Sequence, residues 1–182
     1  MKLPENIDYS QYNNTGGMST KHWGPAYWMF LFSSVMGNYP FKIDETSKEH
    51  LELRTEYINT IKSLILILPC IFCRESLNGF VYELPMEPYS VGRIEMMYWL
   101  YLIKDKVNAK LIGQETHVFT KQQNEIAKLH SVDYQRYLHA LNECKRNSFK
   151  TVETPPFKQV LDYYESLRAS CSLEAKKCII KK

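Results

Sequence analysis

The stretch Leu68-Pro69-Cys70-Ile71-Phe72-Cys73 decides how the middle of this chain folds. Proline is favoured in the first turn of a helix, because the N–H that it lacks has no intrahelical partner there. Pro69 is therefore expected to end one helix and begin another. Both cysteines then lie at a helix N-terminus, where backbone N–H groups and the helix dipole lower the pKa of a thiol. Since the thiolate is the reactive form of cysteine, the pattern predicts dithiol–disulfide exchange.

Helical periodicity on both sides of this motif predicts an all-α protein. The segment before it has a capping-box pattern in Thr46 and Glu49 and an apolar stripe that runs to Leu68. Gly113 is expected to end the aromatic-rich helix that follows Ser90. The expected helices cover about residues 20–37, 44–68, 70–83, 91–112 and 131–146, with a last one after Pro155-Pro156. The fold class is a four-helix bundle with a fifth helix and an additional C-terminal helix.

The bulk composition indicates one domain with tails. The 182 residues are 45% hydrophobic and 24% charged, and the net charge of +3 is too small to indicate a nucleic-acid or anionic-membrane partner. No secretory signal and no uncharged stretch of membrane-spanning length is visible, so a cytoplasmic location is expected. The expected division is a flexible N-terminal arm (1–18), a helical domain (19–146), and a C-terminal helix with a Cys-containing tail (147–182).

The Cys-x-x-Cys alone has three interpretations. A structural zinc site needs four ligands, and the sequence has neither a second Cys-x-x-Cys nor a His pair at the usual spacing, so no metal is expected. A thioredoxin-like fold needs a βαβ pattern, which is absent. The third interpretation is a flavin-linked thiol oxidase with a helical fold.

Three blocks in order favour the third interpretation. They are His22-Trp23-Gly24-Pro25-Ala26-Tyr27-Trp28, the Leu68–Cys73 stretch, and Tyr98-Trp99-Leu100 followed by Val107-Asn108-Ala109-Lys110-Leu111. Together they resemble the Erv/ALR family of FAD-linked sulfhydryl oxidases, and most of all the short members encoded by large DNA viruses. The resemblance covers about residues 20–112.

This resemblance implies the chemistry and the site. Cys70 and Cys73 match the redox-active pair, with Cys73 facing the flavin and Cys70 exchanging with incoming dithiols. Electrons then pass to FAD and on to oxygen, which yields hydrogen peroxide. The implied contacts of FAD are His22, Trp23, Gly24, Tyr27, Trp28, Phe32, Lys104, Asp105, Val107, Asn108, Lys110 and Leu111, with Tyr134 or Tyr137 closing the pocket.

The resemblance also implies partners. These are a dithiol protein substrate or a redox partner with its own Cys-x-x-Cys, and a second copy of the chain in a homodimer. Viral members make disulfides in virion proteins, which places the protein in host cytoplasm or the virion. Cys171 and Cys178 match a distal shuttle disulfide on a mobile tail, while two unrelated thiols or a structural disulfide are the alternatives.

Two positions depart from the family pattern. Phe32 and Lys104-Asp105 stand where the family has imidazoles that hold the adenine part of FAD. Phe32 can still stack on a ring system, and the Lys104 ammonium can contact a phosphate or an aromatic face. The alternative function that follows from these departures is a catalytically inactive, FAD-free relative that acts as a dimeric interaction protein.

Overall fold

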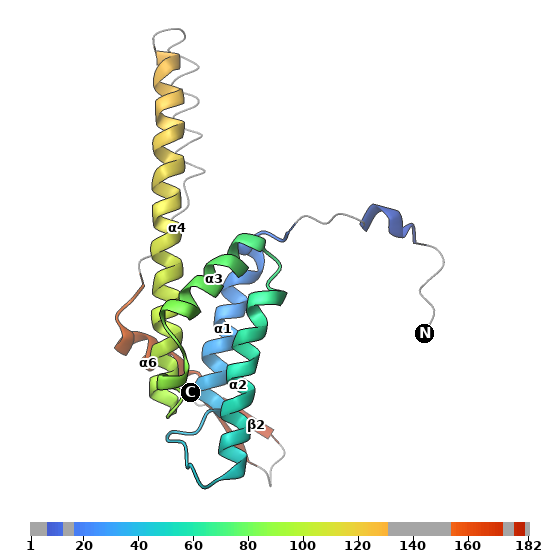
Figure 1. The fold of residues 1–182 in the computed structure, drawn as a ribbon, viewed down its shortest axis with the longest axis vertical. Helices are drawn as coiled ribbons and strands as arrows, with labels where there is room; N and C mark the ends of the chain where they lie inside the picture. Colours follow the sequence, from blue (N-terminus) through green and yellow to red (C-terminus); the bar gives the residue numbers. More distant parts are fainter. Residues whose placement is uncertain (1–6, 13–16, 131–153, 173–176, 181–182) are drawn as a thin grey trace.

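The computed structural model describes residues 7–12, 17–130, 154–172 and 177–180, and its core is a bundle of helices (Figure 1). Helices α1, α2, α3 and α4 form the bundle, and α6 packs against α1 and α4. The elements are η1 (Tyr9–Tyr12), α1 (Thr20–Asn38), α2 (Lys48–Ile67), α3 (Ile71–Glu83), η2 (Glu87–Tyr89), α4 (Arg93–His130), α6 (Phe157–Ser166), β1 (Ala169–Ser172) and β2 (Lys177–Ile180). The helical fold class is thus confirmed.

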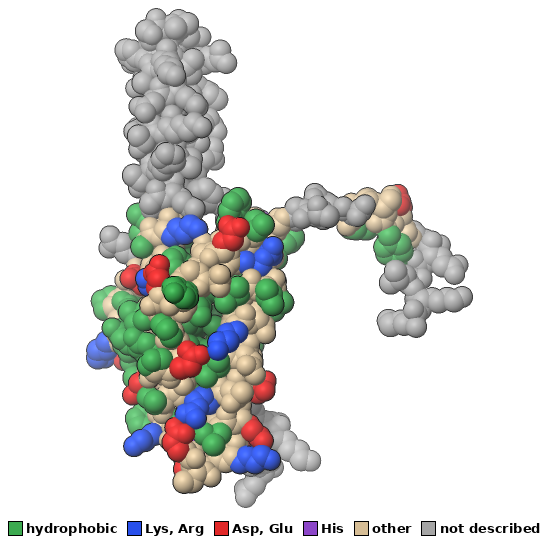
Figure 2. Space-filling view, in the orientation of Figure 1, with side chains coloured by type: hydrophobic (Ala, Val, Ile, Leu, Met, Phe, Trp, Pro, Cys, Tyr) green, Lys and Arg blue, Asp and Glu red, His purple; other side chains and the backbone are tan. Residues whose placement is uncertain are grey.

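The core of the bundle consists of large apolar side chains from α1, α2 and α4, with Met86 and Leu77 closing one side. Polar atoms that enter it are bonded: the buried Trp99 indole N–H donates to the carbonyl of Leu84 at 2.9 Å. The hydroxyl of fully buried Tyr39 donates to the carbonyl of Ser90 at 2.8 Å, and burial raises the pKa of Tyr39 to about 12. These bonds tie the ends of α3 and α1 to the start of α4. Hydrophobic side chains also reach the surface over α3 and α4 (Figure 2).

The break between α2 and α3 falls at Pro69, as predicted. Leu68 ends α2 with its N–H bonded to the carbonyl of Leu64 at 3.1 Å, and its own backbone leaves the helical region. Cys70 is extended, with φ −149° and ψ 118°, and acts as the N-cap of α3. The new helix therefore begins at Ile71, one residue later than expected.

The prediction that Gly113 ends the fourth helix is wrong, because α4 continues from Arg93 to His130. A glycine inside a helix costs only about 1 kcal/mol relative to alanine, which the flanking helix formers offset. A helix ends at glycine only when that residue turns to the left-handed region. The expected helix over 131–146 lies outside the described residues.

The described part of the tail contains two short strands that the sequence did not predict. Strands β1 and β2 form an antiparallel hairpin in which Cys171 and Cys178 are direct register partners. Strands this short carry too little alternation to be recognised from sequence. The hairpin lies near the C-terminal end of α1, because Arg168, just before β1, donates to the carbonyl of Met36 at 2.7 Å (Figure 1).

Within the described part of the chain, none of the helices combines the length and apolarity that crossing a membrane requires.

Gly113→Ala tests the corrected course of α4. Because alanine is the better helix former, this substitution is expected to stabilise the helix around residue 113 by about 0.5–1 kcal/mol. Slower hydrogen exchange of the amides at 110–118 measures the gain. Faster exchange there would mean that Gly113 adopts a left-handed terminating conformation after all.

Candidate redox and cofactor site

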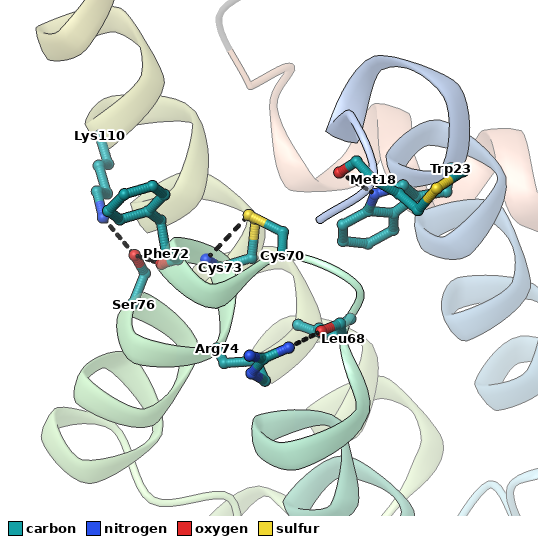
Figure 3. The surroundings of a disulfide bond; sticks show 9 residues. All are labelled: Met18, Trp23, Leu68, Cys70, Phe72, Cys73, Arg74, Ser76 and Lys110. Atoms are coloured by element: carbon teal, nitrogen blue, oxygen red, sulfur yellow. Dashed lines mark hydrogen bonds between the residues drawn. A yellow bond between two sulfur atoms is a disulfide. The ribbon is translucent and has the colours of Figure 1, made fainter. Parts of the chain in front are cut away.

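Cys70 and Cys73 form a disulfide at the first turn of α3, with their Cα atoms 5.2 Å apart (Figure 3). The N–H of Cys73 points at the sulfur of Cys70, at 3.3 Å. Cys73 packs against the buried core of the bundle, and both cysteines are half-buried. When this disulfide is reduced, the N–H groups of the first turn face the sulfur of Cys70 and stabilise its thiolate.

Two hydrogen bonds hold the turn that carries the disulfide. The guanidinium of Arg74 donates to the carbonyl of Leu68 at 2.6 Å, so the last carbonyl of the broken helix has a charged partner. The N–H of Met18 donates to the carbonyl of Pro69 at 2.7 Å. The indole of Trp23 donates in turn to the carbonyl of Met18 at 3.2 Å. The start of α1 is thereby linked to the disulfide turn.

Gly17 lies against this turn at close range. A Cβ atom at Gly17 would come within 2.9 Å of the carbonyl oxygen of Pro69. Only glycine lets the chain before α1 pass here without displacing the turn. In Figure 3, Met18 and Trp23 accordingly lie on one side of the disulfide and Phe72 on the other.

A second cluster combines aromatic rings and a cation from α1, α4 and α6. The ring centroids of Trp28 and Phe32 are 6.1 Å apart, and the Lys104 ammonium lies 5.2 Å from the centroid of the Trp28 ring. Fully buried Phe32 stacks on Tyr164 with centroids 5.1 Å apart and an interplanar angle of 20°. Three residues predicted to contact FAD are thus brought together, and α6 adds a fourth member that the sequence analysis missed.

Lys104 and Asn108 are on one face of α4, as their spacing predicts, and they are bonded to each other at 3.4 Å. The amide of Asn108 also donates to the hydroxyl of Thr154 at 2.7 Å, which attaches the chain before α6 to this face. Burial lowers the pKa of Lys104. Among the described residues, no carboxylate lies within salt-bridge distance of its ammonium. In the part of the chain that the structure describes, the cluster therefore holds a partly buried cation without an anion.

The other predicted contacts are distributed along α1 and α4. Trp23 and Tyr27 are half-buried and meet edge to face at 6.2 Å, nearer the disulfide turn. Lys110 donates to the hydroxyl of Ser76 on α3 and so faces away from the Lys104 cluster. Gly24 and Val107 are half-buried, whereas His22, Asp105 and Leu111 are exposed. Tyr134 and Tyr137 lie outside the described residues.

The predicted shuttle pair is far from the disulfide in this arrangement. The hairpin of Cys171 and Cys178 is at the C-terminal end of α1, whereas the disulfide turn is at its N-terminal end (Figure 1). The 19 residues of α1 span about 28 Å. Exchange between the two pairs within one chain would require the tail to cross that length.

The donor set of the second cluster fits part of FAD. Aromatic faces suit stacking on a planar ring, and an uncompensated ammonium suits a phosphate. An anionic aromatic ligand would remove the cost of burying Lys104 without a counter-charge. A separate hollow of about 210 Å³ opens between α1 and α2, lined mainly by apolar side chains such as Phe30, Val35 and Ile61, and none of the predicted FAD contacts lines it.

The chain has a likeness to a solved structure. No protein-family model matches the chain, and no curated relative matches its sequence. Among solved structures, the chain is similar to the crystal structure of the yeast Erv1 core, with 21% sequence identity and a TM-score of 0.44 over 61% of this chain and 80% of that chain.

Lys104→Met tests whether Lys104 is a cation without a counter-charge. Because burial lowers the pKa of Lys104, the folded state holds this proton less tightly than the unfolded chain does. The charge therefore lowers stability at neutral pH, and this cost fades as the pH rises toward the ordinary lysine pKa of about 10.4. Lys104→Met is expected to raise the free energy of unfolding of the ligand-free protein at pH 7, and to raise it less near pH 10.

The measurement is urea denaturation of both proteins across this pH range. Lys106→Met is the matched control, since Lys106 is also on α4 but pairs with Glu83 at 2.7 Å at the surface. That variant is expected to change stability by less than about 1 kcal/mol. A Lys104→Met protein that is less stable at pH 7 would contradict the assignment.

Proposed function

We propose that this protein is an FAD-linked sulfhydryl oxidase that forms disulfides in protein substrates. The observation that carries the proposal is the Cys70–Cys73 disulfide at the first turn of α3, with the N–H of Cys73 directed at the sulfur of Cys70. A disulfide in this position is a good oxidant, because its reduced form contains a Cys70 thiolate that the N–H groups of the first turn stabilise. The order of the three sequence blocks supports the same function, and the viral members that they resemble make virion proteins the proposed substrates.

The thiol chemistry requires only the two cysteines. A substrate thiolate attacks the sulfur of Cys70, and Cys73 leaves as a thiolate. The second substrate thiolate then attacks the mixed disulfide, so that the substrate leaves oxidised by two electrons and both cysteines are reduced. Cys73 is suited to the inner role because it packs against the core of the bundle. When bound, FAD supplies the acceptor for these two electrons and passes them to oxygen, giving hydrogen peroxide.

The residues proposed to hold FAD come from three helices. Trp28 on α1 and Tyr164 on α6 supply aromatic faces, with the buried Phe32 packed against both rings. Lys104 with Asn108 on α4 supplies donors for a phosphate. FAD bound to these residues would exclude water from the partly buried ammonium.

A second candidate function has its own support. Phe32 is fully buried and one face of its ring is already covered by Tyr164. An aromatic pair that is complete without a ligand would suit a relative that has lost FAD and retains the fold as an interaction protein. Flavin content separates the two candidates.

Flavin absorbance and oxygen uptake test the proposed function. The purified protein is expected to be yellow and to consume oxygen with dithiothreitol as the electron donor. Cys73→Ser is expected to keep the flavin and to lose turnover, because no thiolate remains to pass electrons inward. Cys144→Ser is the control, because Cys144 belongs to none of the three sequence blocks, and it should keep both properties.

The outcomes are distinct. A colourless protein without oxygen uptake would support the FAD-free alternative. Full turnover by Cys73→Ser would contradict the assignment of the redox pair.

A further inference from the structure

Large exposed apolar side chains flank the disulfide in the sequence. Leu66, Ile67, Ile71 and Phe72 have exposed fractions of 78%, 68%, 54% and 70%, and we call these four residues the apolar rim. They come from the last turn of α2 and the first turn of α3. The whole run from 66 to 73 contains no charged residue. The segment that carries the disulfide therefore presents apolar side chains to a partner.

The apolar rim is not required by the core. The inward faces of the same two helices are supplied by Leu64, Leu68 and Leu77, all of which are buried. A single exposed apolar residue is ordinary on a protein surface. Four such residues close in sequence to one reactive bond have an unfavourable free energy of hydration, which contact with a partner would remove. The apolar rim is therefore suited to be an interaction surface.

The disulfide itself determines which partner occupies the rim. Exchange makes a covalent bond between the partner and Cys70, so the residues beside the attacking cysteine must lie over the surface next to that sulfur. Met18 and Trp23 close one side of the turn through their hydrogen bonds to Pro69 and Met18 (Figure 3). Phe72 lies on the other side of the disulfide, and its side chain is exposed.

A positive charge at the edge of the apolar rim further restricts the kind of segment that can bind there. Lys110 donates to the hydroxyl of Ser76, and Figure 3 shows it beside Phe72. Among the described residues, no carboxylate lies within salt-bridge distance of Lys110. A basic segment would be repelled here, whereas a neutral or acidic segment would not.

We propose that the apolar rim selects polypeptide dithiols whose reactive cysteine is flanked by large apolar, non-basic residues, with Phe72 as the main specificity-determining side chain. This inference rests on the proposed exchange chemistry at Cys70–Cys73 and names its substrate class. In the exchange the substrate loses two electrons and a proton from each thiol, and the disulfide gains the two electrons as Cys70 and Cys73 are reduced. No other oxidant takes part in this half-reaction.

A single-turnover assay tests the inference without FAD turnover. Oxidised protein is mixed with a small excess of a dithiol peptide, and peptide disulfide is measured by mass spectrometry over time. Three peptides share one Cys-x-x-Cys and differ only in the residues that flank it. The first has Leu and Phe as flanks, and the second has Ser. The third has the Leu and Phe flanks of the first with Lys added. The wild-type protein is expected to oxidise the first peptide about tenfold faster than the second. The peptide with added Lys is expected to react more slowly than the first.

Matched variants assign the preference to the rim. Phe72→Ser is expected to reduce the rate ratio of the Leu/Phe peptide to the Ser peptide about tenfold, and Phe72→Leu should restore most of it. Phe41→Ser is the control, because Phe41 is 71% exposed, nearly the same as Phe72, but lies in the loop after α1. Its ratio is expected to equal that of the wild type.

Three outcomes would overturn the inference. If the Leu/Phe and Ser peptides react at equal rates while dithiothreitol still exchanges rapidly, the proposed selectivity is wrong but the proposed function stands. No exchange with dithiothreitol overturns both. A rate that rises on removal of residues 1–12 with no flank preference would assign the apolar rim to the chain's own arm, which carries exposed Ile7 and Tyr12.

Discussion

The missing N–H of Pro69 is the constraint on which the site depends. It prevents α2 from continuing and turns the chain so that Cys70 caps a new helix. The two carbonyls that precede the cap are bonded, that of Leu68 to Arg74 and that of Pro69 to Met18. The disulfide is therefore held on a rigid turn, with one cysteine against the core and an apolar surface beside it. The reactivity of the disulfide, its exposure to a substrate and its orientation all follow from the break between α2 and α3.

The second half of the site depends on contacts that are distant in sequence. Tyr164 stacks on Phe32, and Thr154 bonds to Asn108, so α6 and the chain before it cover the face formed by α1 and α4. This covering partly buries Lys104 among aromatic rings and amides rather than carboxylates. Among the described residues this ammonium has no counter-charge, and burial of a cation without one weakens the fold.

The sequence predicted what local rules determine. The break at Pro69 depends on residues within one or two helical turns, and the structure confirms it. Gly113 was misjudged because a glycine stops a helix only through its backbone conformation, which composition does not specify. Tyr164 was missed because no local signal pairs residue 164 with residue 32. The register of Cys171 with Cys178 likewise depends on a strand pairing that four-residue segments do not announce.

The different surroundings of the two cysteines are the central claim, and the alkylation rates of the reduced protein test it most directly. Iodoacetamide is added at pH 7 in limiting amounts, and the modified residue is located by peptide mass spectrometry. Cys70, with its sulfur at the helix cap, is predicted to react several-fold faster than Cys73, which packs against the core. Equal rates, or faster modification of Cys73, would contradict the account.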